Sequence, residues 1–145
     1  MPKKLLLKSY KEPAIVIYRG AFKNTKLVYL ARANKKIRYP WGQSRIAYIG
    51  TTKKGASRIA SSSVWKGGDL LSEYGIKHLD LNIVVCGKRP GVETWKKLER
   101  ALIIRFREIF GSIPKANTMG KKARLKDELH YFSRDRLDTI IQELS

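Results

Sequence analysis

Glu99 is the residue whose position most strongly suggests chemistry. The stretch 92–110 carries apolar residues at helical spacing, and winding it at about 100° per residue gathers them on one arc. Glu99 falls on this arc, about 40° from Trp95 and between Phe106 and Phe110. A carboxylate in apolar surroundings is costly unless a partner compensates its charge. That partner is either an arginine in an internal ion pair or a divalent metal ion at the floor of a cleft.

Two tyrosines and an arginine precede this stretch in the chain. Tyr29 lies in the segment LVYL, Tyr48 lies in AYIG, and Arg58 follows Gly50 by eight residues. A phenol can orient or deprotonate a water molecule, and a permanently charged guanidinium can neutralise phosphate oxygens. Each residue also has a simpler interpretation, because tyrosines are common in strands and an arginine on a helix is commonly solvated.

Short apolar segments bounded by turn residues predict the elements that position these side chains. We expect strands over 14–18, 26–31, 45–50 and 79–86, and helices over 56–64, 69–74, 92–110 and 134–144, the last capped by Ser133. The segment 32–44, with Pro40 and Gly42, is predicted to be a basic loop. The fold class is α+β, a small three-stranded mostly antiparallel sheet flanked by helices, with an extra N-terminal strand and a C-terminal helix.

Positive charge dominates the chain. Its 145 residues include 31 Lys and Arg against 12 Asp and Glu, a net charge of +19, and Glu12 is the one acid before Asp69. Such an excess indicates a polyanionic partner, nucleic acid above all. The candidate contact residues combine basic and aromatic side chains: Lys35, Lys36, Arg38, Arg45, Lys53, Lys54, Trp65 and Lys66.

The remaining composition excludes several classes of protein. A single cysteine, Cys86, rules out an internal disulfide framework and a multi-cysteine zinc site. Two histidines, His78 and His130, leave little material for histidine chemistry. No apolar run approaches the roughly 20 residues of a membrane span, so we expect an intracellular protein, cytoplasmic or nucleoid-associated, with no membrane partner.

The ordered set of motifs resembles the GIY-YIG nuclease family. Tyr29 and Tyr48 occupy the two tyrosine motifs, Arg58 follows on the next helix, and Glu99 lies on a later helix, with Asn117 downstream. The resemblance covers about residues 26–118. It implies a catalytic core over 26–118 in a single domain, with a basic N-terminal extension over 1–25 and a helical extension over 119–145.

Four positions depart from the family pattern. The first motif reads Leu27-Val28-Tyr29, so its glycine and isoleucine are replaced while its tyrosine remains. Ser62 stands where many members carry histidine, and Thr51 replaces a lysine that often follows the second motif.

The resemblance implies a divalent-metal-dependent endonuclease that hydrolyses DNA. Tyr29 would act as general base or water-orienting group with Tyr48 beside it, and Arg58 would neutralise the phosphate. Glu99 would hold one Mg²⁺ or Mn²⁺ ion, and Asn117 would orient a neighbour or the backbone, although it can also be a plain turn residue.

Other functions also agree with this sequence. One is a non-catalytic basic module that binds nucleic acid, and another is an RNA-cleaving member of the same fold. At this length there is little room for a separate DNA-reading domain, so specificity must come from 32–45, the N-terminal arm, the C-terminal helix or self-association as a homodimer.

Overall fold

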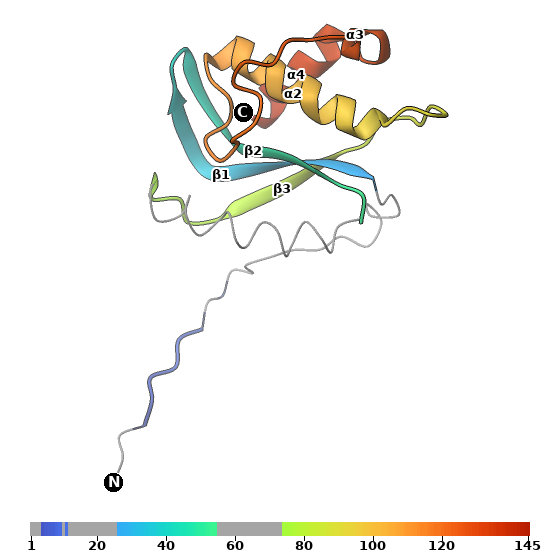
Figure 1. The fold of residues 1–145 in the computed structure, drawn as a ribbon. Coiled ribbons are helices and arrows are strands. Elements are labelled where there is room, and N and C mark those ends of the chain that lie inside the picture. Colours follow the sequence, from blue (N-terminus) through green and yellow to red (C-terminus); the bar gives the residue numbers. More distant parts are fainter. Residues whose placement is uncertain (1–3, 10, 12–25, 55–73) are drawn as a thin grey trace.

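Three antiparallel strands and a set of helices make up the part of the chain that the structure describes. A computed structural model describes residues 4–9, 11, 26–54 and 74–145. Its elements are β1 (Leu27–Tyr39), β2 (Gly42–Thr52), β3 (Leu79–Val84), α2 (Thr94–Phe110), α3 (Glu128–Tyr131) and α4 (Arg134–Leu144). The sheet order is β2-β1-β3, and α2, α3 and α4 lie together on one face of it (Figure 1). The predicted α+β class and the antiparallel sheet are therefore confirmed.

The predicted basic loop over 32–44 is wrong, because β1 and β2 form one long hairpin. Only Pro40 and Trp41 lie between the two strands. Ile37 and Tyr39 are buried while the residues beside them are exposed, so buried and exposed side chains do alternate in the half of β1 nearest the turn. The register shifts between Arg32 and Ile37, and this irregularity breaks the period-two pattern by which a strand is identified.

The two long helices agree with the sequence, apart from the start of α2. The helix predicted over 92–110 begins at Thr94, and it ends where Gly111 adopts a left-handed conformation. The predicted cap of α4 is confirmed, since the Ser133 hydroxyl accepts a hydrogen bond from the Arg136 N–H. The short α3 was not predicted. The predicted strand over 14–18, the helix over 56–64 and all of 69–74 except Tyr74 lie outside the described residues.

The C-terminal helix shares the core of the sheet. Leu137 and Ile141 of α4 are fully buried in the same apolar cluster as Ile46 of β2 and Phe106 of α2. The edge of the Tyr39 ring meets Phe106, with the ring centroids 5.0 Å apart. The segment expected to be an extension thus buries part of the same core as the sheet.

Two ion pairs, each with one buried partner, connect α2 to the C-terminal segment. The guanidinium of Arg105, 8% exposed, binds both carboxylate oxygens of Asp138 on α4, at 2.7 and 2.9 Å. Arg100 donates from Nε to Glu128, whose side chain is 2% exposed, at 2.7 Å. Breaking such a pair leaves an uncompensated buried charge, so these contacts hold α3 and α4 against α2.

Glu128 makes the stability of the fold pH-dependent. Burial opposes its ionised form, but the backbone N–H groups of Lys126 and Glu128 and the Arg100 guanidinium outweigh burial and hold the pKa of Glu128 below its usual range. The stabilisation is present above about pH 4.5 and is lost as the pH falls through the lowered pKa. We expect Glu128→Gln to reduce the free energy of unfolding by about 2 kcal/mol at pH 7.

This difference between wild type and variant should shrink as the pH falls from 5 to 3. Urea unfolding at several pH values measures it. Glu143→Gln, on the exposed side of α4, is the matched control and should change neither the free energy nor its pH dependence. A pH-independent difference for Glu128→Gln would contradict the assignment.

Candidate active site

The hairpin brings Tyr29 and Tyr48 together on one face of the sheet. Tyr29 of β1 pairs with Gly50 of β2, and Tyr48 lies two residues before Gly50, so both side chains point to the same face. Their ring centroids are 5.8 Å apart. They belong to a small apolar cluster with Leu27, Leu81 and Ile83, on the face opposite the main core.

Gly50 is the residue that lets the two rings meet. A Cβ atom at this position would lie 2.5 Å from Cε1 of Tyr48 and 2.7 Å from Cζ and Oη of Tyr29. Real Cβ atoms do not approach other atoms so closely, so any larger residue would displace one ring. The AYIG motif therefore needs glycine at position 50 because the two tyrosine rings approach its backbone closely, and not because the backbone there adopts an unusual angle.

Glu99 lies close enough to influence Tyr48. Burial raises the pKa of Tyr48, a hydrogen bond from the Tyr29 hydroxyl lowers it, and the nearby Glu99 carboxylate raises it again. The net effect is a pKa above the ordinary value, so Tyr48 stays a neutral phenol at physiological pH. Tyr29, Tyr48 and Glu99 thus form one electrostatically coupled group.

Tyr29 is only 4% exposed. So little exposed surface leaves room for contact with a water molecule or one phosphate oxygen, and not for stacking on a base. The position suits a group that orients a small reactant.

Asn117 contacts the backbone of β2 beside this group. Its Oδ1 accepts from the Ile49 N–H at 2.9 Å, and its Nδ2 donates to the Ile49 carbonyl at 2.8 Å. The Ala116 N–H donates to the Ala47 carbonyl at 2.9 Å, so residues 116–117 pair with the outer edge of β2. Asn117 therefore holds the residue between Tyr48 and Gly50 and acts as a positioning residue.

Glu99 is the described residue best suited to hold a divalent ion. It is half-buried on α2, beside the tyrosine pair. Mg²⁺ needs only one or two protein carboxylates and completes its coordination with water and phosphate oxygens, so one glutamate suits Mg²⁺ or Mn²⁺. Within residues 4–9, 11, 26–54 and 74–145, no group of three His, Cys, Asp or Glu side chains could hold a metal ion.

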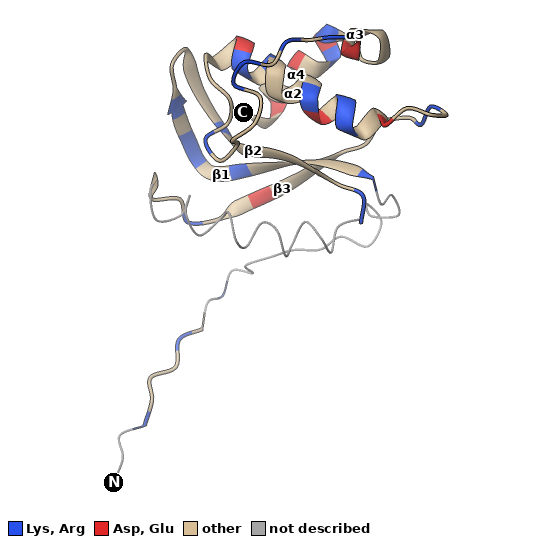
Figure 2. Cartoon of the chain, viewed as in Figure 1, with Lys and Arg blue, Asp and Glu red and all other residues tan. Residues whose placement is uncertain are grey.

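The predicted nucleic-acid contacts lie at two ends of the hairpin. Lys53 and Lys54 follow β2 and are exposed near the tyrosines, whereas Lys35, Lys36 and Arg38 lie toward the turn. Seven residues of strand separate Tyr29 from Lys36, a span of about 20 Å. Basic residues also recur along the first turns of α2 (Figure 2).

Four other predicted site residues need separate mention. Arg45 is engaged within the fold, because its Nε donates to the Ala33 carbonyl at 2.7 Å and its Nη2 lies 3.4 Å from Asp80. Arg58, predicted to bind phosphate, lies outside the described residues, as do Trp65 and Lys66.

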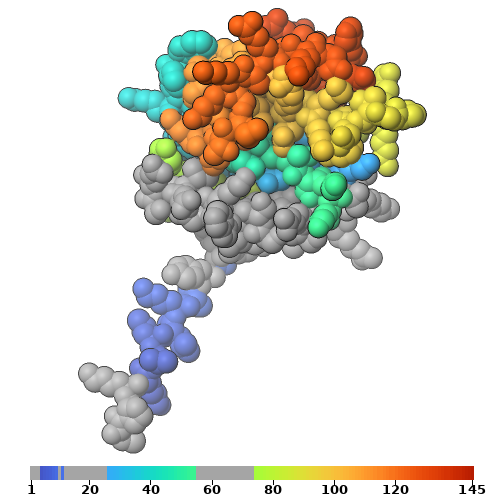
Figure 3. Space-filling model, viewed as in Figure 1, coloured from blue at the N-terminus to red at the C-terminus, as the bar shows by residue number. Residues whose placement is uncertain are grey.

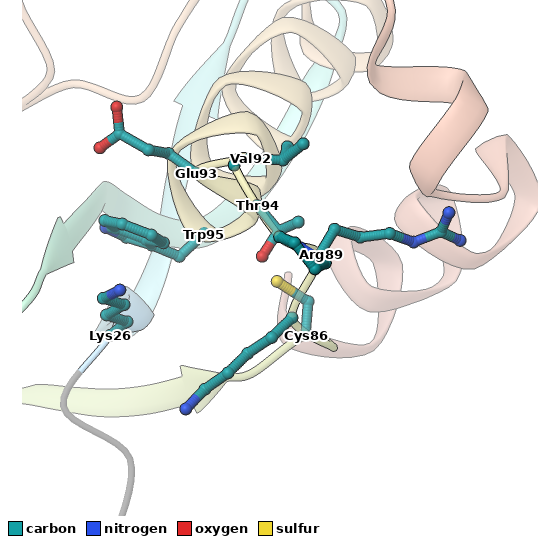
Figure 4. A pocket seen from close by; sticks show the side chains of 10 residues that line it. Lys26, Cys86, Arg89, Val92, Glu93, Thr94 and Trp95 are labelled. Carbon is teal, nitrogen blue, oxygen red and sulfur yellow. The ribbon is translucent and has the colours of Figure 1, made fainter.

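A basic cavity, which no sequence motif predicted, opens beside the group of Tyr29, Tyr48 and Glu99. It has a volume of about 850 Å³ and lies between the start of β1, the connection from β3 to α2, and the first turn of α2. These segments meet the end of β2 at one end of the molecule, on the right in Figure 3. Lys26, Lys88 and Arg89 line the cavity with Trp95 and Cys86 (Figure 4). In the sequence, the proline and glycine between Arg89 and Val92 could have predicted the fixed turn beside this cavity.

Comparisons of the chain with protein-family models, with curated proteins and with solved structures find no match. Among the helices of the described residues, none is both long and apolar enough to cross a membrane.

Proposed function

We propose that the protein is a divalent-metal-dependent endonuclease that hydrolyses phosphodiester bonds in DNA. The observation that carries the proposal is the coupled group of Tyr29, Tyr48 and Glu99, placed between basic surfaces. A phenol can orient the attacking water and a half-buried carboxylate can hold a divalent ion, and a metal-assisted attack of water on a phosphate uses both. The strongly basic chain accounts for binding to a polyanionic substrate.

Each residue of the group has a distinct role in this proposal. The Tyr29 oxygen accepts a hydrogen bond from the attacking water and orients it, and the proton that the water loses passes to solvent. Tyr48 remains neutral because its pKa is raised, and its oxygen accepts the hydrogen bond from Tyr29. Glu99 would hold the divalent ion, which supplies Lewis-acid stabilisation of charge on the phosphate and the leaving oxygen. Asn117 keeps the Tyr48 segment in position through the Ile49 backbone.

A cleavage assay on four substrates tests the proposal. Supercoiled plasmid, linear duplex DNA, single-stranded DNA and RNA are each incubated with Mg²⁺, Mn²⁺ or EDTA. We expect cleavage of DNA with either metal and none with EDTA. Salt-sensitive binding without cleavage of any substrate would overturn the nuclease and favour a binding module. Preferential cleavage of RNA would overturn the choice of DNA.

Replacing Tyr29 by phenylalanine should lower the cleavage rate by about a hundredfold, because the ring still packs while the hydroxyl is lost. Single-turnover cleavage measures the rate, and thermal unfolding checks that the ring contact with Tyr48 still supports the fold. Tyr131→Phe is the matched control, since Tyr131 lies on α3, away from the tyrosine pair. A Tyr29→Phe protein that cuts at the wild-type rate would remove Tyr29 from the mechanism.

A further inference from the structure

The cavity beside Trp95 takes no part in the chemistry proposed above, yet its lining is strongly basic. Among the described residues of the lining, Lys26, Lys88 and Arg89 contribute three positive charges against the one carboxylate of Glu93. The Lys26 ammonium lies 4.5 Å from the centre of the Trp95 ring, which places this charge over the aromatic wall. In Figure 4 Lys26 faces Trp95, while Arg89 extends to the other side, where its guanidinium lies 5.8 Å from the Tyr131 ring.

The Glu93 carboxylate does not cancel this charge. Glu93 forms an ion pair with Lys96 at 2.8 Å. The hydrogen bond from Lys96 and the charges of Lys96, Lys53 and Lys26 hold the pKa of Glu93 below its usual range. A carboxylate stabilised in this way by several cations lies in positive surroundings, so the mouth of the cavity attracts anions.

The backbone between β3 and α2 presents the basic residues from a fixed turn. The Val92 N–H donates to the Arg89 carbonyl at 3.1 Å, with Pro90 and Gly91 between them. Gly91 has φ of +72°, and a proline followed by such a glycine is typical of a type II turn. A fixed turn keeps Lys88 and Arg89 beside the cavity before any ligand binds, which reduces the entropy lost on binding.

The cavity is lined in part by the same elements, β1 and α2, that carry the candidate active site. Lys26 lies three residues before Tyr29 at the start of β1, and Trp95 lies one turn before Glu99 on α2, about 6 Å along the helix. Lys53, at the end of β2, is close enough to affect Glu93. Lys26 and Lys53 therefore place positive charge at the cavity end of the two strands that carry Tyr29 and Tyr48.

We propose that this cavity binds the sugar–phosphate backbone of DNA next to the phosphate that is attacked at Tyr29 and Glu99. The proposal rests on the proposed function for the position of the attacked phosphate, but binding can be measured without cleavage. Lys26 and Lys88 contact phosphates on one side of the Arg89–Val92 turn, and Arg89 contacts the strand where it leaves the cavity.

Binding of a fluorescent DNA duplex in EDTA, followed by anisotropy at several salt concentrations, tests the cavity. The double variant Lys26→Gln, Lys88→Gln should bind at least about tenfold more weakly at 0.1 M salt, and the slope of log K against log salt should fall by about two. Lys121→Gln, Lys122→Gln removes the same charge from exposed positions near the far end of α2, about 20 Å away. This control should bind more tightly than the cavity variant and keep more of the slope.

A cavity variant that binds like the control pair would overturn the proposal. The two proposals fail in different ways. If the cavity variant loses binding and wild type cleaves nothing with any metal, the proposed DNA site stands and the proposed nuclease activity is wrong. Metal-dependent cleavage by wild type, with unchanged binding by the cavity variant, keeps the nuclease and removes the site. A wild-type protein that binds no DNA removes both.

Cys86 allows a second test that needs no substitution. It is the one cysteine of the chain, it lines the cavity, and it is partly exposed. Bound DNA should slow its alkylation by neutral iodoacetamide at least about fivefold at low salt, and 1 M salt should abolish the protection by releasing the DNA. Alkylation at the same rate with saturating DNA as without it would show that the cavity stays open, and would overturn the proposal.

Discussion

Glu99→Gln is expected to reduce Mg²⁺-dependent cleavage of DNA by about a thousandfold, close to 4 kcal/mol of transition-state stabilisation. Glutamine keeps the size of the side chain and its half-buried position on α2. It loses the charge that a hard cation requires, and the amide oxygen is a weaker ligand than a carboxylate. Single-turnover cleavage across a series of Mg²⁺ concentrations measures the effect.

The same variant separates metal binding from DNA binding. Removing a negative charge beside a polyanion should leave the affinity for DNA equal or higher, so a lower rate cannot come from weaker binding. Glu143→Gln makes the same chemical change on the exposed side of α4 and should cut like wild type. A folded Glu99→Gln protein that binds DNA and cuts at the wild-type rate would remove the metal assignment.

Gly50→Ala should impair both stability and cleavage. The added Cβ would lie 2.5 to 2.7 Å from atoms of Tyr48 and Tyr29, so at least one ring must move. We expect the free energy of unfolding to fall by about 2 kcal/mol, as for other overpacked sites. A displacement of about 1 Å in a catalytic group costs about a hundredfold in rate, so cleavage should fall by at least that factor.

The matched control for this variant is Gly87→Ala. A Cβ atom at Gly87 meets no atom within 4 Å, and the backbone there does not need glycine. Urea unfolding and single-turnover cleavage, at a temperature where every variant is folded, compare the two substitutions. If Gly50→Ala is as stable and as active as Gly87→Ala, the close approach of the two rings does not matter for function.

Local sequence patterns were enough to predict the regular elements whose spacing and end signals lie close together in the chain. The apolar spacing of 94–110 and the left-handed Gly111 define α2, and Ser133 marks the start of α4. The outer half of the hairpin was missed because the irregular register between Arg32 and Ile37 breaks the alternation. The ion pairs of Arg105 and Glu128 were missed because their partners lie 28 to 33 residues away.

The sequence by itself determined the class of the fold and the basic character of the chain. It also identified Tyr29, Tyr48 and Glu99 as candidate site residues. The class and the charge follow from composition and periodicity, and the candidates follow from short motifs that resemble those of the GIY-YIG nuclease family; all are properties of neighbouring residues. The tertiary structure alone decided that Gly50 makes room for both rings and that Asn117 holds the Ile49 backbone. It alone joined Lys26, Lys88 and Trp95 in one cavity. Contacts between residues far apart in the chain depend on register and packing, and no local pattern encodes either.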